Sequence, residues 1–333
     1  MNYRILGNTG LSVSHLSFGA SALGGVFHAI DEREGIRAVH AALDAGINYF
    51  DVAPAYGGTA AETVLGKALR GVPRGRYHLS TKAGKYTGPG AYGTDVLDYS
   101  EARIRSGLKE SMKRLGVDFI DIVHLHDFEY EGYSETENAF TEGFPALVKL
   151  KREGRIGSVG AGIYPMELWR HVIEEAPVDA IMLHNHYCLS DTRGLELLEG
   201  CQASNIGIIN ASPFASGLLT GGPIADWHPA NKEDRRVFAL AALFCEQHGT
   251  SLAKIAFQFS CEESPFHTTM FSSSRTASVQ RNLAWHAEPL DQDLLSGVRR
   301  ILKPVIDKQW DYDDGIIRLK DSGKESNITL NPR

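Results

Sequence analysis

The sequence predicts a single closed (β/α)8 barrel (a TIM barrel) with an N-terminal β-hairpin and an extra C-terminal helix. Short runs of β-branched and aromatic residues alternate with longer runs of helical period, and this happens eight times along 333 residues. No Gly- or Pro-rich linker divides the chain, as expected of one domain. The first predicted strand ends "SFGASALGG" (17–25), which departs from the GxGxxG pattern of the competing doubly wound sheet.

The elements are expected in the following order. Residues 3–14 form a hairpin, because a Gly-Asn-Thr-Gly turn joins two short alternating runs. The eight strands are expected at 16–21, 48–53, 78–83, 119–126, 156–163, 179–185, 207–212 and 267–273. Helices are expected near 32–45, 60–70, 100–115, 138–153, 165–175, 191–204, 232–248 with 251–262, and 276–286, and a last one near 292–303. The barrel domain then covers 1–315 and a polar tail covers 316–333.

Composition and charge exclude several classes of partner. The formal net charge is −7 and no Lys/Arg block occurs, which argues against a nucleic-acid surface. The first ten residues lack the pattern of a signal peptide, and the longest apolar run, "VFALAALF" (237–244), is too short to span a membrane. The four cysteines show no CxxC pairing, so reduced thiols in a cytoplasmic protein are expected. No pattern indicates an oligomeric state.

Polar side chains end three consecutive predicted strands. Asp51 ends the second strand and is followed by Tyr56, Lys82 ends the third strand, and His126 ends the fourth. Each has a simpler interpretation alone, as a turn cap, a surface lysine or a hydrogen-bonded histidine. In a barrel, however, the carboxyl ends of the strands meet at one mouth, where the chemistry lies. A buried lysine and a buried aspartate there would each need a partner, and they can serve one another.

This set of residues suits the interconversion of a carbonyl and an alcohol. A tyrosine has a pKa of about 10, and a nearby ammonium lowers it. We therefore expect Lys82 to lower the pKa of Tyr56, Asp51 to hold Lys82, and His126 to orient the reacting oxygen. Proton transfer at oxygen must accompany hydride transfer at carbon, and hydride transfer needs a cofactor, since no side chain carries a hydride.

Three motifs closely resemble those of the aldo-keto reductase superfamily. They are "GINYFDVAPAYG" (46–57), "LSTKAG" (79–84) and "LGVDFIDIVHLHD" (115–127), and the resemblance covers nearly the whole chain. It implies a (β/α)8 barrel that binds a nicotinamide dinucleotide in extended form without a Rossmann domain and without a metal. It also implies a catalytic tetrad, which is Asp51, Tyr56, Lys82 and His126.

Other stretches resemble a narrower group, the L-galactose dehydrogenases and aldose 1-dehydrogenases. They are "GASALGGVF" (19–27), "YGGTAAETVLGKAL" (56–69), "HLHDFE" (124–129), "ASPFASGLLT" (211–220) and "DWHPA" (226–230). This resemblance implies a free sugar of the L-galactose or L-fucose type as substrate, whose anomeric C1 hydroxyl is oxidised to the lactone. A general aldehyde or ketone reductase is the alternative. The expected substrate-binding residues are Tyr56, His126, Asp127, His186 and Trp227.

The sequence favours NAD as cofactor, with NADP as the alternative. Barrels of this kind bind phosphate with the loops after their seventh and eighth strands. In NADP-preferring relatives a lysine and an arginine face the 2′-phosphate, and Ser272 and Ser278 match these positions. Without these two charged partners, binding of the 2′-phosphate of NADP is weaker by roughly 1.5–3 kcal/mol for each. Arg275 lies nearby in the sequence and is a cation that favours the phosphate. The expected cofactor-binding residues are Gly19, Ala20, Ser212, Pro213, Phe214, Ser216, Gly217, Leu218, Ser272, Ser273, Ser274, Ser278 and Asn282.

Two other classes of function stay open at this stage. A metal-dependent barrel hydrolase could use the pairs His124/His126 and His184/His186, because residues i and i+2 of a strand share a face. Such hydrolases, however, carry the HxH motif on the first strand, where this sequence has none. A nucleotide-sensing binding module on the same fold is the third hypothesis, and the intact tetrad argues against it.

Overall fold

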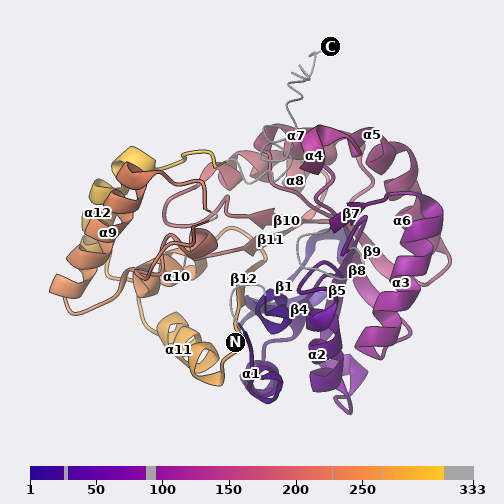
Figure 1. Ribbon diagram of the computed structural model, residues 1–333, viewed down its shortest axis with the longest axis horizontal. Helices are drawn as coiled ribbons and strands as arrows, with labels where there is room; N and C mark the ends of the chain where they lie inside the picture. The colour runs from indigo at the N-terminus through magenta and orange to yellow at the C-terminus, as the bar shows by residue number, and fades with distance from the viewer. Residues whose placement is uncertain (26–28, 88–94, 227, 263, 311–333) are drawn as a thin grey trace.

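The computed structural model describes residues 1–25, 29–87, 95–226, 228–262 and 264–310. Eight parallel strands form a closed barrel in the order β10-β11-β12-β3-β4-β5-β8-β9, so each barrel strand lies beside the next one along the chain and the last, β12, pairs with the first, β3. Figure 1 shows helices surrounding these strands, with α9 and α12 together at the left-hand edge. The predicted fold class is therefore confirmed.

The strands begin and end close to the predicted positions. The barrel strands are β3 (Leu16–Gly19), β4 (Tyr49–Asp51), β5 (His78–Ala83), β8 (Ile120–His126), β9 (Ile156–Gly162), β10 (Ala180–His184), β11 (Gly207–Ala211) and β12 (Thr268–Ser272). Two antiparallel strand pairs lie outside the barrel: β1 (Tyr3–Ile5) with β2 (Ser12–Ser14), as predicted, and β6 (Lys85–Thr87) with β7 (Asp95–Leu97), where no strand was predicted.

The helices follow the alternation read from the sequence. They are α1 (Glu32–Asp44), α2 (Ala60–Leu69), α3 (Glu101–Leu115), α4 (Tyr130–Tyr133), α5 (Thr136–Asn138), α6 (Phe144–Arg152), α7 (Met166–Glu175), α8 (Leu198–Ala203), α9 (Lys232–Gln247), α10 (Leu252–Glu262), α11 (Thr276–Ala287) and α12 (Gln292–Leu302). The helix predicted at 191–204 is instead a 3-10 turn, Arg193–Leu197, followed by the short α8. The helix predicted at 138–153 begins with a π-helical turn, Ala139–Gly143, before α6.

Local sequence signals explain where several helices begin. Asp31 precedes α1 and accepts a hydrogen bond from the backbone of Arg33, and Ser100 caps α3 in the same manner. Asn231 and Asp234 form a reciprocal capping box at the start of α9. These side chains satisfy amide groups that the first turn of a helix leaves unpaired.

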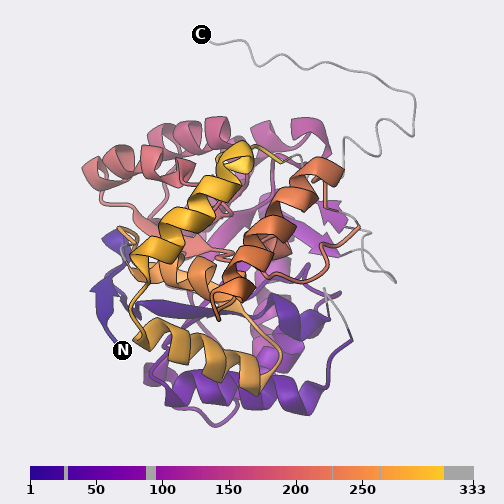
Figure 2. The same ribbon diagram turned by 90° about the vertical axis from the view of Figure 1, so that its left-hand side faces the viewer.

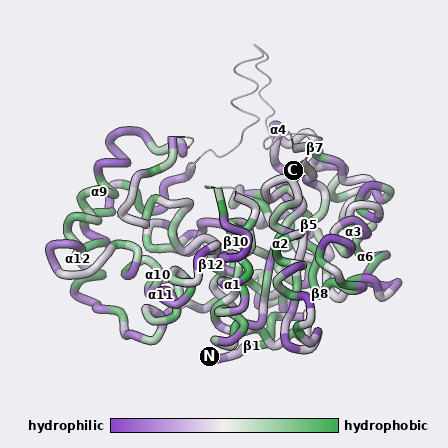
Figure 3. The backbone as a smooth tube through the Cα atoms, turned by 60° about the horizontal axis from the view of Figure 1, so that its bottom comes forward, coloured by the Kyte–Doolittle hydropathy of each residue, from purple (hydrophilic) through white to green (hydrophobic). Residues whose placement is uncertain are grey.

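Apolar side chains pack in three clusters. The largest lies between the barrel and the surrounding helices, the second joins α9, α10 and α12, and the third fills the barrel interior and includes Tyr49, Ile122 and Met270. Figure 2 shows α9 and α12 side by side, and Figure 3 shows hydrophobic and hydrophilic residues alternating along the outer helices. Because the barrel interior is filled, chemistry is confined to its mouth.

The two predictions about the ends of the chain have different outcomes. The N-terminal hairpin contributes Leu6 and Val13 to the cluster inside the barrel and so closes its floor. The extra C-terminal helix is α12. The tail expected at 316–333 lies outside the described residues. Among the residues that are described, no helix is both long and apolar enough to cross a bilayer.

Candidate active site

Asp51 and Lys82 form a buried ion pair at the barrel mouth. The ammonium of Lys82 donates to Asp51 Oδ2 and, at 3.0 Å, to the carbonyl of Val52. Burial alone would lower the pKa of Lys82, but the Asp51 carboxylate outweighs burial and keeps this pKa above its usual value. Lys82 is therefore a fixed cation at working pH. The two side chains lie together because β4 and β5 are neighbouring strands and Asp51 pairs with Ser80, two positions before Lys82 on the same face of β5.

Tyr56 and His126 lie against this ion pair. The ammonium of Lys82 is 4.9 Å from the centre of the Tyr56 ring. The rings of Tyr56 and His126 meet edge to face, with centroids 6.1 Å apart. The structure thus brings the four residues predicted as a tetrad to one mouth, although they are far apart in the sequence.

The protonation state of Tyr56 differs from the expectation. Burial raises the pKa of Tyr56 more than the charge of Lys82 lowers it, so the net shift is upward. The sequence argument considered the ammonium alone, and its predicted direction for this pKa is wrong in the protein described here. Burial also lowers the pKa of His126 to about 3, so His126 is neutral at working pH.

Beneath the tetrad lies a hydrogen-bonded chain that the sequence analysis missed. Ser80 donates to Asp51 Oδ1 at 2.7 Å, and Tyr49 donates to Ser80 at 2.8 Å. The Tyr49 hydroxyl is also 3.5 Å from His124 Nε2. The period of two along a strand could have revealed these residues, because Ser80 and Tyr49 each lie two positions before a tetrad residue. The chain fixes the second oxygen of Asp51 and so orients its partner Lys82.

Gly160 makes room for this chain, and an alanine there is expected to destabilise the protein. A Cβ at Gly160 would lie 2.2 Å from His124 Nδ1, so the imidazole would have to move. We expect Gly160→Ala to lower the free energy of unfolding by about 1–3 kcal/mol, the usual cost of overpacking. Urea denaturation measures the change. Gly162→Ala is the control on the same strand, because its nearest neighbour would be 3.9 Å away, and equal losses in the two variants would contradict the prediction.

The loop after β8 adds a fixed carboxylate beside His126. Asp127 has a left-handed backbone (φ 53°), which turns the chain at the strand end. Its carboxylate is 3.3 Å from His126 Nε2 and accepts a hydrogen bond from Lys85 at 2.9 Å. Burial raises the pKa of Asp127. Its neighbours His126 and Lys85 together lower this pKa by more than burial raises it, so the net shift is downward. The mouth therefore holds an ionised acceptor next to the catalytic histidine.

Glu129 lies two residues beyond Asp127 and behaves differently. Its Oε1 accepts a hydrogen bond from the amide of Tyr164 at 2.7 Å. Burial, and then the charge of Asp127, raise the pKa of Glu129 well above its usual value. Within one loop the chain thus places a carboxylate near His126 whose pKa is lowered and a second carboxyl group whose ionisation burial disfavours.

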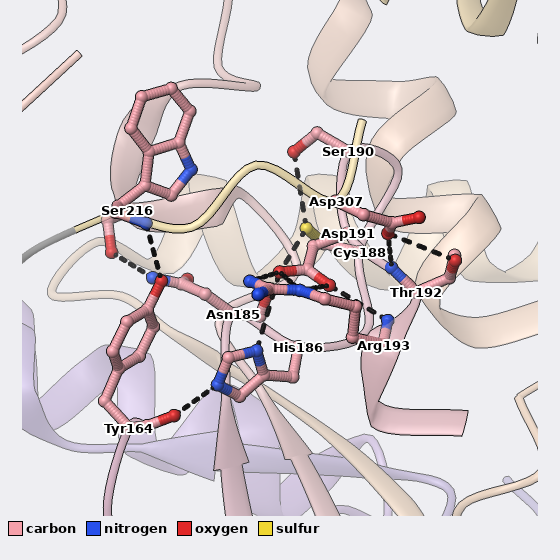
Figure 4. Close-up of polar contacts among 11 residues, drawn as sticks. Tyr164, Asn185, His186, Cys188, Ser190, Asp191, Thr192, Arg193, Ser216 and Asp307 are labelled. Carbon is pink, nitrogen blue, oxygen red and sulfur yellow. Dashed lines mark hydrogen bonds and ion pairs between the residues drawn. The ribbon is translucent and has the colours of Figure 1, made fainter. Parts of the chain in front are cut away.

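The remaining predicted substrate residues have other surroundings. The ring of His186 is buried; its Nε2 lies 2.5 Å from the carbonyl of Tyr164, and its Nδ1 lies 3.5 Å from Asp191. Figure 4 shows this ring between Tyr164 and Asp191, with Arg193 paired to the same carboxylate. His186 thus helps to order the loop after β10, and its role toward substrate stays a prediction. Trp227 lies outside the described residues.

The predicted cofactor residues lie at the ends of β3 and β12, in the segments after β3, β11 and β12, and on α11. The amide of Ala20 donates to the carbonyl of Asp51 at 2.7 Å, which places Gly19 and Ala20 beside the tetrad. Ser216 accepts a hydrogen bond from Asn185 at 2.8 Å (Figure 4). The other residues after β11 are Ser212, Pro213, Phe214, Gly217 and Leu218, and those after β12 are Ser272, Ser273, Ser274, Ser278 and Asn282.

A buried polar atom on α11 fits a bound dinucleotide. Asn282 is only 2% exposed, and among the described residues its Oδ1 has no hydrogen-bond partner. Buried polar groups are seldom left unsatisfied. A ligand that reaches α11 from the mouth would supply the missing partner.

Comparison with known proteins identifies the family. The model of the aldo/keto reductase family matches residues 15–303. The chain belongs to the aldo/keto reductase family. It is similar to the L-galactose dehydrogenase of Arabidopsis thaliana, with 37% identity over 92% of this chain and 96% of that protein. It is also similar to the D-threo-aldose 1-dehydrogenase of a Pseudomonas species, with 33% identity over 84% of this chain and 91% of that one.

Solved structures agree with this assignment. An aldo-keto reductase from Bacillus halodurans in its holo form superposes with a TM-score of 0.73 at 26% identity, covering 93% of this chain and 99% of the other. The chain is thus an oxidoreductase of the aldo/keto reductase family, whose members use nicotinamide cofactors. Family membership also removes the reason to favour a metal-dependent hydrolase. Within the described ranges, no group of three or more His, Cys, Asp or Glu side chains could hold a metal ion.

Proposed function

We propose that this aldo/keto reductase oxidises the anomeric C1 hydroxyl of a free aldose, of the L-galactose or L-fucose type, to the lactone with NAD as hydride acceptor. The observation that carries the proposal is the ionised Asp127, fixed by Lys85 beside the neutral His126. A fixed carboxylate suits a substrate with several hydroxyl groups, because it accepts their hydrogen bonds. The similarity to L-galactose and D-threo-aldose dehydrogenases supports the same substrate class.

The residues at the mouth divide the work of the reaction. His126 is neutral and orients the C1 hydroxyl. Tyr56 takes the proton from that hydroxyl as the carbonyl of the lactone forms, and Lys82 stabilises the charge on the phenolic oxygen. Bound NAD supplies the hydride acceptor, and its positively charged ring favours the phenolate of Tyr56. Asp51 keeps Lys82 charged and in place.

A second candidate function rests on the raised pKa of Tyr56. A tyrosine that keeps its proton at neutral pH is a good donor to the oxygen of a carbonyl that is being reduced. This favours the general aldehyde or ketone reductase. Measuring NADH formation over a panel of free aldoses, beside NADH consumption with simple aldehydes, separates the two. If no sugar is oxidised while aldehydes are reduced, the reductase is the correct assignment.

The role of Asp127 gives a sharper test. We expect Asp127→Ala to raise KM for the preferred aldose roughly 10- to 100-fold, because a hydrogen bond to a charged group contributes about 1.5–3 kcal/mol. Reduction of a small aldehyde without hydroxyl groups should change less than threefold. Steady-state kinetics with both substrates measures the difference. Asp118→Ala is the control, since Asp118 is exposed just before the opposite end of β8. An equal loss with sugar and aldehyde would argue against sugar recognition by Asp127.

A further inference from the structure

The carboxylate of Glu34 lies on the first amide of α11. Glu34 belongs to the first turn of α1, and its Oε1 accepts a hydrogen bond from the amide of Thr276 at 2.7 Å. Its Oε2 accepts hydrogen bonds from the guanidinium of Arg37 at 2.5 and 3.0 Å. The Thr276 amide first, and then Arg37, lower the pKa of Glu34 to about 2. A permanent negative charge therefore joins the helix after the first barrel strand to the helix after the last.

This charge lies where a barrel of this kind binds phosphate. The loops after the seventh and eighth strands and the N-terminus of the following helix form the usual phosphate site. Here that helix is α11, and the amide that would face an anion already faces Glu34. The hydroxyl of Ser272, at the end of β12, is also engaged, because it accepts hydrogen bonds from Ala22 at 2.9 Å and Ser21 at 3.0 Å.

An unsatisfied buried polar group indicates that a ligand reaches α11. The buried Oδ1 of Asn282 lacks a partner among the described residues, whereas the side chain of Thr276 interacts with Glu34. The carboxylate of Glu34 can itself accept further hydrogen bonds, since each of its oxygens has two lone pairs. The ligand groups that fit are therefore hydroxyl donors, and a second anion would meet repulsion.

We propose that Glu34 selects NAD over NADP, by accepting hydrogen bonds from the free hydroxyls of the adenosine ribose and by repelling a 2′-phosphate. The inference rests on the proposed function, because it requires a dinucleotide that runs from the tetrad to α11. Acidic side chains that bind the ribose hydroxyls of NAD in other folds use the same chemistry. Arg37 contacts only Oε2 of Glu34 and offsets part of its charge, Oε1 lies at the first amide of α11, and Arg275 is exposed just before α11.

Equilibrium binding of NADH and NADPH tests the inference without substrate. We expect the wild-type protein to bind NADH at least tenfold more tightly than NADPH. Glu34→Gln keeps an acceptor for the Thr276 amide, removes the charge and releases Arg37. We expect this variant to bind NADPH at least tenfold more tightly than the wild type does, with NADH affinity unchanged or weaker. Titration calorimetry measures all four dissociation constants.

Two control variants isolate the effect. Glu32→Gln removes a carboxylate from the same turn of α1 that pairs with Lys67 at 2.8 Å, and it should leave the ratio of NADH to NADPH affinity unchanged. Arg37→Ala should not improve NADPH binding, because Glu34 keeps its charge. Thermal unfolding of each variant shows whether it is folded.

The possible failures are distinct. If the wild type binds neither dinucleotide, this result contradicts both the proposed function and this inference. If the wild type binds NADH but Glu34→Gln leaves the ratio of affinities unchanged, or changes it no more than Glu32→Gln does, only the role of Glu34 is overturned. A wild-type preference for NADPH would overturn it as well.

Discussion

Tyr56→Phe is expected to reduce kcat by roughly 10²- to 10⁴-fold, the contribution of a positioned acid or base. The change removes one hydroxyl oxygen and keeps the ring that contacts Lys82 and His126. Binding of NADH should stay within threefold of the wild type, since the ring still fills its place at the mouth. Steady-state kinetics and fluorescence titration with NADH measure the two quantities.

Tyr3→Phe provides the matched control for this substitution. The hydroxyl of Tyr3 donates to the carbonyl of Gly46 from the N-terminal hairpin, which closes the opposite end of the barrel. Its loss should leave kcat unchanged. If Tyr56→Phe retained more than a tenth of wild-type turnover, or if its affinity for NADH fell as far as its kcat, Tyr56 would not be the proton-transfer residue.

Asp51→Asn should reduce both stability and activity. It leaves the buried ammonium of Lys82 without its anionic partner, and breaking a buried ion pair in this way costs about 3–5 kcal/mol. The pKa of Lys82 should fall, because burial then acts without the opposing carboxylate. Once Lys82 loses its charge, Tyr56 loses the cation that stabilises its phenolate. Urea denaturation and initial rates measure the two effects.

The double variant Asp51→Asn with Lys82→Met separates the two effects. It removes the unpaired charge, so we expect it to recover most of the lost unfolding free energy. It should remain inactive, because no cation lies near Tyr56. A double variant as unstable as the single one would show that packing, and not charge, sets the stability of the mouth. Turnover in the double variant would contradict the role of Lys82.

Much of the fold could be read from the sequence because it depends on local pattern. The strands β8 and β9 are short segments containing Ile and Val between turn residues, and the structure places them within one residue of the predicted positions. The predicted helix at 191–204 is less regular in the structure. Asp191 pairs with Arg193 and accepts a hydrogen bond from its amide. This local contact favours a turn over a regular helix at the start of the segment 191–204.

The positions of charged residues in the site were predictable, because a buried charge needs a partner. The pKa values in the site were not predictable, because they depend on burial. A lysine and an aspartate at neighbouring strand ends need each other, and this placed Asp51 with Lys82 before any coordinates were considered. The pKa of Tyr56 depends on how much water surrounds its hydroxyl, which sequence spacing does not encode. Lys85 was missed for a similar reason, since its contact with Asp127 depends on the unpredicted strand pair of β6 and β7.

Closure of the barrel joins residues that are made at very different times. The first barrel strand pairs with the last, as in the contact between Leu16 and Thr269, so the sheet has two open edges until nearly the whole chain has left the ribosome. Open strand edges favour pairing with other chains. The nascent protein therefore carries all four tetrad residues, and the greatest risk of aggregation, well before the final strand can seal the cylinder.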